Sequence, residues 1–198
     1  MELDVEFPLD FETSIPTAKG YAVCVCDKYV VITEVWSYSV AVYDATTLKL
    51  VSRFGTEGND RGQFAFNLFY SGLCPRPGAF LSVFIADSCN GRVSEHLILS
   101  GDCVRLLGLT HLHYPRGVDA NDTHIVVSDV STMYSRVLLF SCNAVDDVAP
   151  LWVFGGMHGS SLRKLNDPYG VRLSDDGSAV YVADSTCFGP LASRAWFF

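Results

Sequence analysis

The stretch FIADSCNGRV, residues 84–93, joins an apolar run to an acid, a short polar turn and an arginine. Aromatic and β-branched residues favour strands, and the pair Asn-Gly is typical of a tight turn between two strands. The same letters also permit a chemical interpretation, in which Asp87, Cys89 and Arg92 form a small reactive site. Recurrence of the stretch separates these hypotheses, because an active site rarely needs the same residues in several copies.

The order of strand, acid, turn and arginine does recur along the chain. IVVSD at 125–129 is followed by Arg136, and VYVAD at 180–184 is followed by Arg194. A weaker copy, YVVITE at 29–34, precedes a second apolar run, SVAVYD. The recurrence favours a repeat architecture over a reactive site.

The spacing of three markers supports the repeat. A glycine upstream of each acid moves in steps of 52, 45 and 53 residues, the acids move in steps of 53, 42 and 55, and the Phe-Gly or Leu-Gly pairs move in steps of 53 and 47. Periods of this size are expected of β-propeller blades. The markers are Gly20, Gly72, Gly117 and Gly170; Glu34, Asp87, Asp129 and Asp184; and Phe54-Gly55, Leu107-Gly108 and Phe154-Gly155.

The repeat predicts an all-β fold, a β-propeller whose blades are four-stranded antiparallel sheets. One such sheet cannot bury both of its apolar faces, whereas radially stacked sheets cover one another. We expect about four blades, with the last one stopping at its third strand. Their predicted ranges are 15–62, 63–112, 113–165 and 166–198.

The repeat resembles the NHL-repeat family of β-propellers. The residues that carry the resemblance are GQF at 62–64, ADSCNGRV at 86–93, YPRGVDANDTHIVVSD at 114–129 and DPYGVRLSDDGSAVYVADS at 167–185. They follow the family's order of Gly-x-Phe, Pro-x-Gly-Val, Val-Ala-Asp and Asn-x-Arg-Val. The third and fourth units match well, the second lacks the proline, and the first is degenerate.

The number of units departs from the family, whose rings usually have about six blades. The chain is therefore expected to form an incomplete or open ring, and exposed sheet edges would then favour oligomerisation. Alternatively, four blades close into a ring, with LDVEFPLDF at 3–11 supplying the missing outer strand. Residues 1–14 are accordingly expected to be an N-terminal segment outside the blades.

Composition limits the classes of function. Of the 198 residues, 49% are hydrophobic and 18% charged, which predicts a folded protein. The formal net charge of −8 disfavours a general nucleic-acid or anionic-membrane surface. The N-terminal residues lack a basic and apolar signal, no long apolar run is present, and the seven cysteines form no CxxC pair. Reduced thiols in a cytoplasmic protein are the resulting expectation.

The repeated charged residues are expected to be structural. Each acid should accept backbone N–H groups from the turn that follows it, and each repeat arginine should pair with the acid of its unit. A metal-dependent propeller hydrolase or lyase would need several ligands converging on the channel, but only His113 stands just before the Pro-x-Gly element. Cys89 has no partner besides the distant His96 that would make it a nucleophile. No catalytic residue, metal or cofactor is predicted.

The remaining candidate site is one face of the propeller, around its channel. The segments that lead into each blade and the turns between its second and third strands are expected to gather on this face. Tyr and Arg often anchor protein contacts. The predicted partner-binding residues are Tyr70, Asn90, Arg92, His113, Tyr114, Arg116, Asp167 and Tyr169.

These residues predict a non-enzymatic interaction module that binds a protein or peptide on its channel face. The family resemblance implies an alternative, the substrate-recognition part of a ubiquitin-ligase system, in which some members bind RNA. The acidity of this chain disfavours RNA as a partner. A metal-dependent propeller hydrolase or lyase is the third hypothesis.

Overall fold

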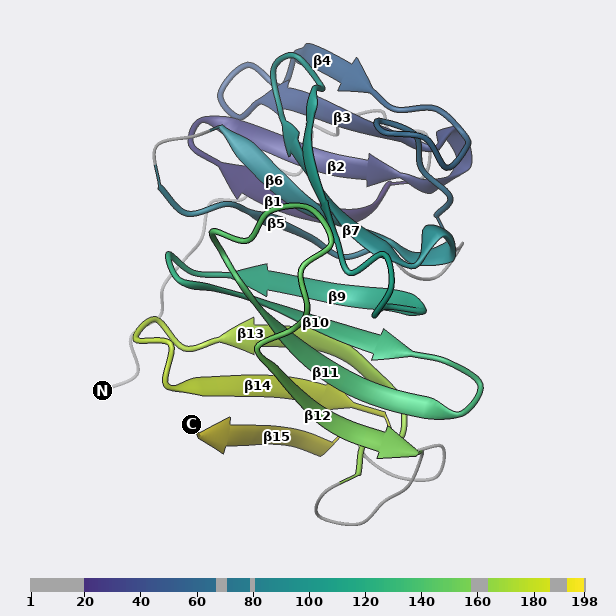
Figure 1. Ribbon diagram of the computed structural model, residues 1–198. Coiled ribbons are helices and arrows are strands. Elements are labelled where there is room, and N and C mark those ends of the chain that lie inside the picture. Colours follow the sequence, from purple (N-terminus) through teal and green to yellow (C-terminus); the bar gives the residue numbers. More distant parts are fainter. Residues whose placement is uncertain (1–19, 67–70, 79–80, 158–163, 186–191, 198) are drawn as a thin grey trace, which may run out of the picture.

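The computed structural model describes residues 20–66, 71–78, 81–157, 164–185 and 192–197, the last range by its backbone (Figure 1). It is an all-β structure of four antiparallel sheets, three with four strands and one with three. In every sheet the strands are hydrogen-bonded in sequence order. The predicted all-β class is confirmed, and the sheets are arranged like propeller blades.

We number the sheets as blades 1–4, and each of the four predicted ranges contains one of them. Blade 1 consists of β1 (Gly20–Cys26), β2 (Tyr29–Glu34), β3 (Ser39–Asp44) and β4 (Leu50–Phe54). Blade 2 consists of β5 (Leu73–Pro75), β6 (Ser82–Asp87), β7 (Arg92–Leu97) and β8 (Cys103–Leu107).

The second half of the chain repeats the arrangement. Blade 3 consists of β9 (Tyr114–Ala120), β10 (His124–Val130), β11 (Tyr134–Ser141) and β12 (Trp152–Met157). Blade 4 consists of β13 (Pro168–Leu173), β14 (Ala179–Asp184) and β15 (Ala192–Phe197). Blade 4 therefore ends at its third strand among the described residues, as the sequence predicts.

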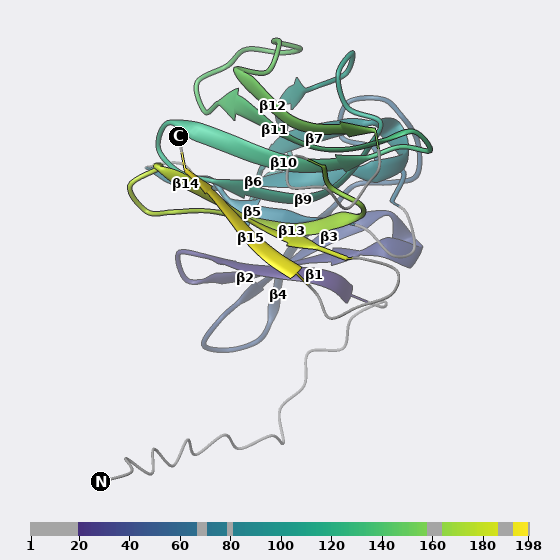
Figure 2. The same ribbon diagram turned by 90° about the horizontal axis from the view of Figure 1, so that it is seen from below.

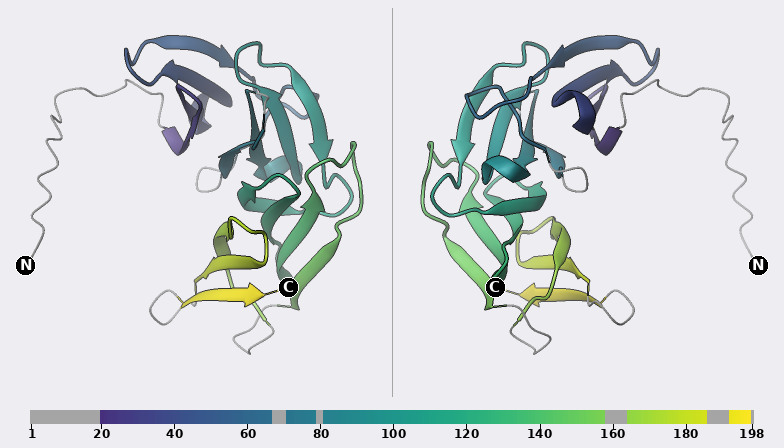
Figure 3. Two further views of the ribbon diagram at one scale, coloured as in Figure 1. Left: turned by 90° about the vertical axis from the view of Figure 1, so that its left-hand side faces the viewer. Right: turned by 90° about the vertical axis from the view of Figure 1, so that its right-hand side faces the viewer.

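The four blades follow one another along an arc (Figure 3). The first strand of each blade lies on the inside, and β5 packs between β1 and β9, with β13 on the far side of β9 (Figure 2). The described strands form no closed ring. The predicted N-terminal segment, residues 1–14, and its closing strand lie outside the described residues.

Three apolar cores hold the arc together, one in each joint between neighbouring blades. Val31 and Val42 of blade 1 pack with Ile85 of blade 2. The other two cores join blade 2 to blade 3 and blade 3 to blade 4. Because each core lies between two sheets, no blade buries its apolar residues alone, which is the behaviour of a repeat protein.

In blades 2 and 3 the repeat acid and arginine connect the blade to the segment leading into it. In blade 2 the buried Asp87 carboxylate accepts the Nε–H of Arg92 at 2.8 Å and the backbone N–H of Ala65 at 2.7 Å. The Arg92 guanidinium also donates to backbone carbonyl oxygens of Asn59, Asp60 and Gln63. The predicted pairing of acid and arginine is confirmed for this unit.

The backbone partners of the acids differ from the prediction. Asp129 accepts the N–H groups of His113 and Tyr114, at 2.8 and 2.9 Å, and Asp184 accepts those of Asn166 and Asp167. These N–H groups lie at or just before the start of the first strand of the blade and do not belong to the turn after the acid. The expectation of a local turn was wrong because the first strand begins beside the acid, so its backbone donors lie closer.

Helical structure in the described part of the chain consists of two three-residue 3₁₀ turns, η1 (Val35–Ser37) and η2 (Ser88–Asn90). None of it has the length and apolar character that a membrane-spanning helix requires.

His96 gives the fold a pH dependence. Its ring is buried between the rings of Phe54 and Phe64, at centroid distances of 5.3 and 5.2 Å, and this burial lowers its pKa. The unfolded chain takes up the His96 proton near pH 6.5, whereas the folded chain does so only at lower pH. The stabilisation that comes from burying His96 in its neutral form is therefore complete above pH 6.5. It is lost as the pH falls from there towards the lower pKa that His96 has in the folded chain.

We expect the melting temperature of the wild type to fall more steeply between pH 7.5 and pH 5 than that of His96→Gln, because the variant lacks this titration. Thermal unfolding followed by circular dichroism at half-unit pH steps measures both slopes. Parallel profiles for the two proteins would contradict this assignment.

Candidate functional site

The inner strands present one pair of residues at equivalent positions in all four blades. In blade 3 this pair is Arg116-Gly117. The next residue, Val118, lies opposite Val127, which is two residues before the repeat acid Asp129. The same rule pairs Val23 with Ile32, Leu73 with Ile85 and Val171 with Val182. The equivalent pairs are therefore Tyr21-Ala22, Ser71-Gly72, Arg116-Gly117 and Tyr169-Gly170.

This register corrects one of the sequence markers. The glycine spacing aligns Gly20 with Gly72, but Gly20 lies opposite the acid Glu34, and Ala22 occupies the equivalent position. The irregularity in the pairing of β1 with β2 between Gly20 and Val23 recurs at the same place in blades 3 and 4, where Pro115 and Pro168 lie opposite the acid, so Gly20 is equivalent to these prolines. The glycine spacing does not reveal this, because the connection between the first two strands differs in length from blade to blade.

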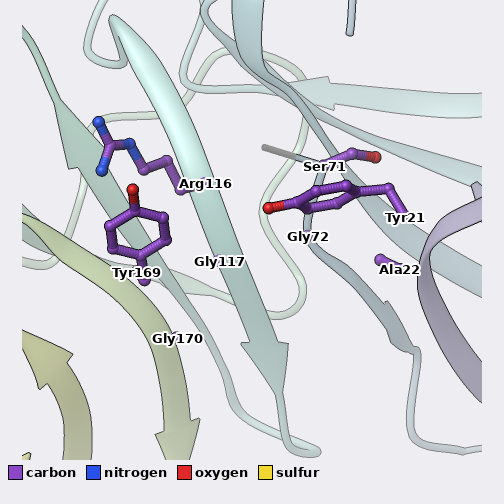
Figure 4. Close-up of a pocket in the computed structure, with 8 residues that line it drawn as sticks. All are labelled: Tyr21, Ala22, Ser71, Gly72, Arg116, Gly117, Tyr169 and Gly170. Carbon is purple, nitrogen blue, oxygen red and sulfur yellow. The ribbon is translucent and has the colours of Figure 1, made fainter. Parts of the chain in front are cut away.

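The four pairs line one cavity of about 200 Å³ on the inside of the arc (Figure 4). Each blade supplies two adjacent residues, which lie in its first strand or, in blade 2, directly before it. Residues as far apart in the sequence as Tyr21 and Gly170 therefore meet around one cavity. The cavity corresponds to the channel of a propeller. Concave sites with a few polar groups among apolar walls are typical ligand sites.

Arg116 and Tyr169 form the polar side of the cavity. The Arg116 guanidinium carbon lies 4.6 Å from the centre of the Tyr169 ring, and its Nη1 is 2.6 Å from Oδ1 of Asp167. Carboxylate and ring together hold the guanidinium in place, since a charge-assisted hydrogen bond and a cation–π contact act on one group. Tyr169 stays 36% exposed, so its ring remains available to a partner.

Ser71 and Tyr21 complete the other side. The Ser71 hydroxyl is buried and has no hydrogen-bond partner within the described chain. Buried hydroxyls are nearly always satisfied, so this one is a candidate for a hydrogen bond to a bound molecule. Tyr21 is exposed and stands opposite Arg116 and Tyr169 in Figure 4.

His113 and Tyr114 lie at the start of β9, beside the cavity residues of the same strand. His113 is exposed, and its Nδ1 lies 2.9 Å from Nη2 of Arg136 and 3.6 Å from Oδ2 of Asp129. Tyr114 is 46% exposed. Both are accessible on the surface where the sequence places the partner-binding site.

Two predicted site residues are corrected by their burial and contacts. Arg92 is only 3% exposed, and its guanidinium is occupied by Asp87 and three backbone carbonyl oxygens. The Asn90 amide donates to Asp87 and to the carbonyl oxygen of Gly58. Both side chains hold the joint between blades 1 and 2: Arg92 is too buried for a surface contact, and the half-buried Asn90 has its amide hydrogens occupied within the chain. Tyr70 lies outside the described residues.

Sequence reasoning missed Tyr21 and Ser71. Alignment of the repeat glycines would have found Ser71, because it directly precedes Gly72. Tyr21 is hidden by the misaligned Gly20, and only the register of β1 with β2 places it in the cavity.

The described residues contain no group of three or more His, Cys, Asp or Glu side chains placed to hold a metal ion. Cys89 lies in the turn η2 and is largely exposed. Partial desolvation of its thiol and, to a smaller extent, the negative charge of Asp87 raise its pKa. A raised pKa disfavours the thiolate that nucleophilic chemistry needs. Cys24 is also a free thiol, and burial raises its pKa to about 12.

Comparison with known proteins adds support for the fold. No protein-family model matches this chain. No curated protein matches it either. A functionally unknown protein from Desulfotomaculum acetoxidans DSM 771 is similar in structure, with a TM-score of 0.58 and 16% identity over 82% of this chain and 48% of its own. Hydrazine synthase of Kuenenia stuttgartiensis has a TM-score of 0.54 and 15% identity over 83% of this chain and 43% of its own.

This chain therefore spans less than half the length of these two solved structures. At such identities the likeness concerns the fold alone, because one fold carries many functions.

Proposed function

We propose that this chain is an NHL-type propeller arc that acts as a non-enzymatic interaction module and binds a peptide segment of a protein partner on its channel face. The observation that carries the proposal is the cluster of Arg116, Asp167 and Tyr169 at the cavity. Tyr and Arg are the residues that most often dominate binding energy at protein interfaces. A guanidinium already held by a carboxylate and a ring loses little freedom on binding.

The cavity suits a side chain of the partner better than a folded surface. Its volume of about 200 Å³ is below that of usual small-molecule pockets, but it accommodates one or two side chains. Tyr21, Tyr114 and Tyr169 are exposed around it and offer ring surface with a hydroxyl at the tip. The Ser71 hydroxyl then supplies a hydrogen bond inside the cavity.

Selection of random peptides displayed on phage, with the immobilised wild-type protein as bait, tests this proposal. We expect selected peptides to bind at least about tenfold more weakly to Tyr169→Ala and to Arg116→Ala, which is the loss typical of an interface anchor. Fluorescence anisotropy with synthetic peptides measures the dissociation constants.

Leu151→Ala is the matched control, because Leu151 is exposed in the loop between the outer strands β11 and β12 and does not line the cavity. Its peptide affinity is expected to equal that of the wild type. Peptides that bind Tyr169→Ala and Arg116→Ala as tightly as wild type would show that the channel face is not the site.

A further inference from the structure

We propose that two copies of this chain associate head to tail, with the outer face of blade 4 of each copy docking on the exposed face of blade 1 of the other. Blade 1 is the sheet β1–β4 and blade 4 the sheet β13–β15. The pair would have two identical joints, each built like the joints that already connect the blades within one chain. The proposal concerns the ends of the arc and does not rest on peptide binding in the channel, although Tyr21 and Gly170 also line the channel cavity.

The second and third joints within the chain each have a glycine on one side and a backbone carbonyl on the other. A Cβ atom built on Gly72 would come closer than 3.0 Å to the carbonyl oxygen of Arg116, and one built on Gly117 would come equally close to that of Tyr169. The second and third joints therefore depend on the absence of a side chain at this position. Glycine permits this close approach of two backbones.

Gly170 has the same position in blade 4, and no further blade lies against it among the described residues. A Cβ built on it would meet only the Cβ of Ala183, in its own blade, at 3.8 Å. Arg172 and Tyr181 are exposed on this same face. Blade 4 thus carries the glycine feature of a joint on a surface that nothing covers among the described residues.

Blade 1 carries the opposite half of a joint. Leu73, Val118 and Val171 are equivalent residues of blades 2, 3 and 4, and each packs into the core shared with the preceding blade. Their counterpart in blade 1 is Val23, which is 64% exposed. Tyr21 and Val25 extend the same apolar stripe along β1 and are also exposed.

The two open faces are complementary because all three internal joints have a shared apolar core and two of them set a glycine against a carbonyl oxygen. A second copy of the chain carries both halves, and the two ends of the arc lie on the same side of the molecule (Figure 3). Two arcs facing each other would satisfy both ends of both copies, as a closed twofold pair requires. Burial of apolar surface at each joint supplies the driving force.

Sedimentation velocity over a hundredfold range of protein concentration tests the pairing. Each chain has a mass of 21.7 kDa, and we expect the wild type to reach twice this mass and not exceed it. Val23→Asp would place a charge on the apolar stripe, and Gly170→Leu would fill the vacant glycine position. Because each substitution acts in both joints, a tenfold weakening per joint raises the dimer dissociation constant by about a hundredfold.

Val145→Asp is the matched control, since Val145 is 75% exposed in the loop between β11 and β12 and takes no part in the proposed joint. This variant is expected to dimerise like the wild type. Circular dichroism shows whether Val23→Asp and Gly170→Leu keep their fold, which is expected because both positions face solvent in one copy.

A mixture of Val23→Asp and Gly170→Leu separates head-to-tail pairing from other modes. One intact joint remains possible in the mixed pair, between the normal blade 1 of Gly170→Leu and the normal blade 4 of Val23→Asp. The other joint carries both substitutions, and a joint already opened by one of them loses little more from the second, because losses within one contact are not additive. The mixture should therefore dimerise more strongly than either variant alone. A wild type that stays monomeric, a mass that rises beyond the dimer, or variants that dimerise like wild type would each overturn the proposal.

Discussion

Asp87→Ala is expected to destabilise the fold by about 3–5 kcal/mol, the cost of removing one partner from a buried ion pair. The Asp87 side chain is fully buried and that of Arg92 nearly so. Without the carboxylate, the Arg92 guanidinium keeps a buried positive charge that backbone carbonyl oxygens alone accompany. The backbone N–H of Ala65 and the amide of Asn90 lose their acceptor as well.

Urea unfolding followed by tryptophan fluorescence or circular dichroism measures this loss. A loss of this size is a large fraction of the roughly 5–15 kcal/mol by which natural domains are stable. Asp87→Asn keeps the shape of the side chain but removes the charge that pairs with Arg92, so this variant is also expected to be less stable than the wild type.

The pair of Arg61 and Asp146 provides a matched control. Its Nη1 to Oδ2 distance is also 2.8 Å, but both side chains are nearly half exposed. Water screens such pairs, and their contribution is about 0–1 kcal/mol. If Arg61→Ala destabilises the protein as much as Asp87→Ala, burial does not explain the role of the repeat acid.

Gly117→Ala is the second substitution with a large expected effect. Its added methyl group would meet the carbonyl oxygen of Tyr169 closer than 3.0 Å, and it would also lie 3.1 Å from the hydroxyl of Ser128. Neighbouring backbone cannot rotate away as a flexible side chain can, so blades 3 and 4 must separate. We expect a loss of about 2–3 kcal/mol, the upper part of the usual range for overpacking.

Gly170→Ala is the control, because the same methyl group would meet only the Cβ of Ala183 there, at an ordinary contact distance of 3.8 Å. Its effect on a single copy is expected to stay within about 0.5 kcal/mol, as for surface substitutions. Unfolding should be measured at concentrations where sedimentation shows one copy, so that pairing does not contribute. Equal losses for the two variants would mean that the close approach of blades does not decide the choice of glycine.

Much of the fold was predictable because its signals are local and repeated. Strand composition, the recurring acid and the Phe-Gly pairs appear at similar spacing, and the sheets formed by β5–β8 and β9–β12 lie where these signals predict them. The pairing of Asp129 with Arg136 follows from the same register, since the two residues lie opposite each other on β10 and β11.

The candidate site was only partly predictable. Residue type and a place before or within the first strands single out Arg116, Asp167 and Tyr169, and the structure brings them together. Arg92 is an arginine like Arg116, but it is buried because the segment before blade 2 folds over it. Burial of this kind has no marker in a single sequence.

The sequence by itself determined that this chain is a repeat of antiparallel sheets, which acid marks each unit, and which arginine pairs with that acid in the second and third units. The tertiary structure alone decided which residues meet in the channel and which faces of the arc stay uncovered. The reason is physical: strand propensity and turn chemistry act between neighbours in the chain, whereas the cavity depends on the stacking of four sheets. The equivalence of Ala22, and not Gly20, with the later glycines is seen only when the strands are paired, because the connection between the first two strands differs in length between blades.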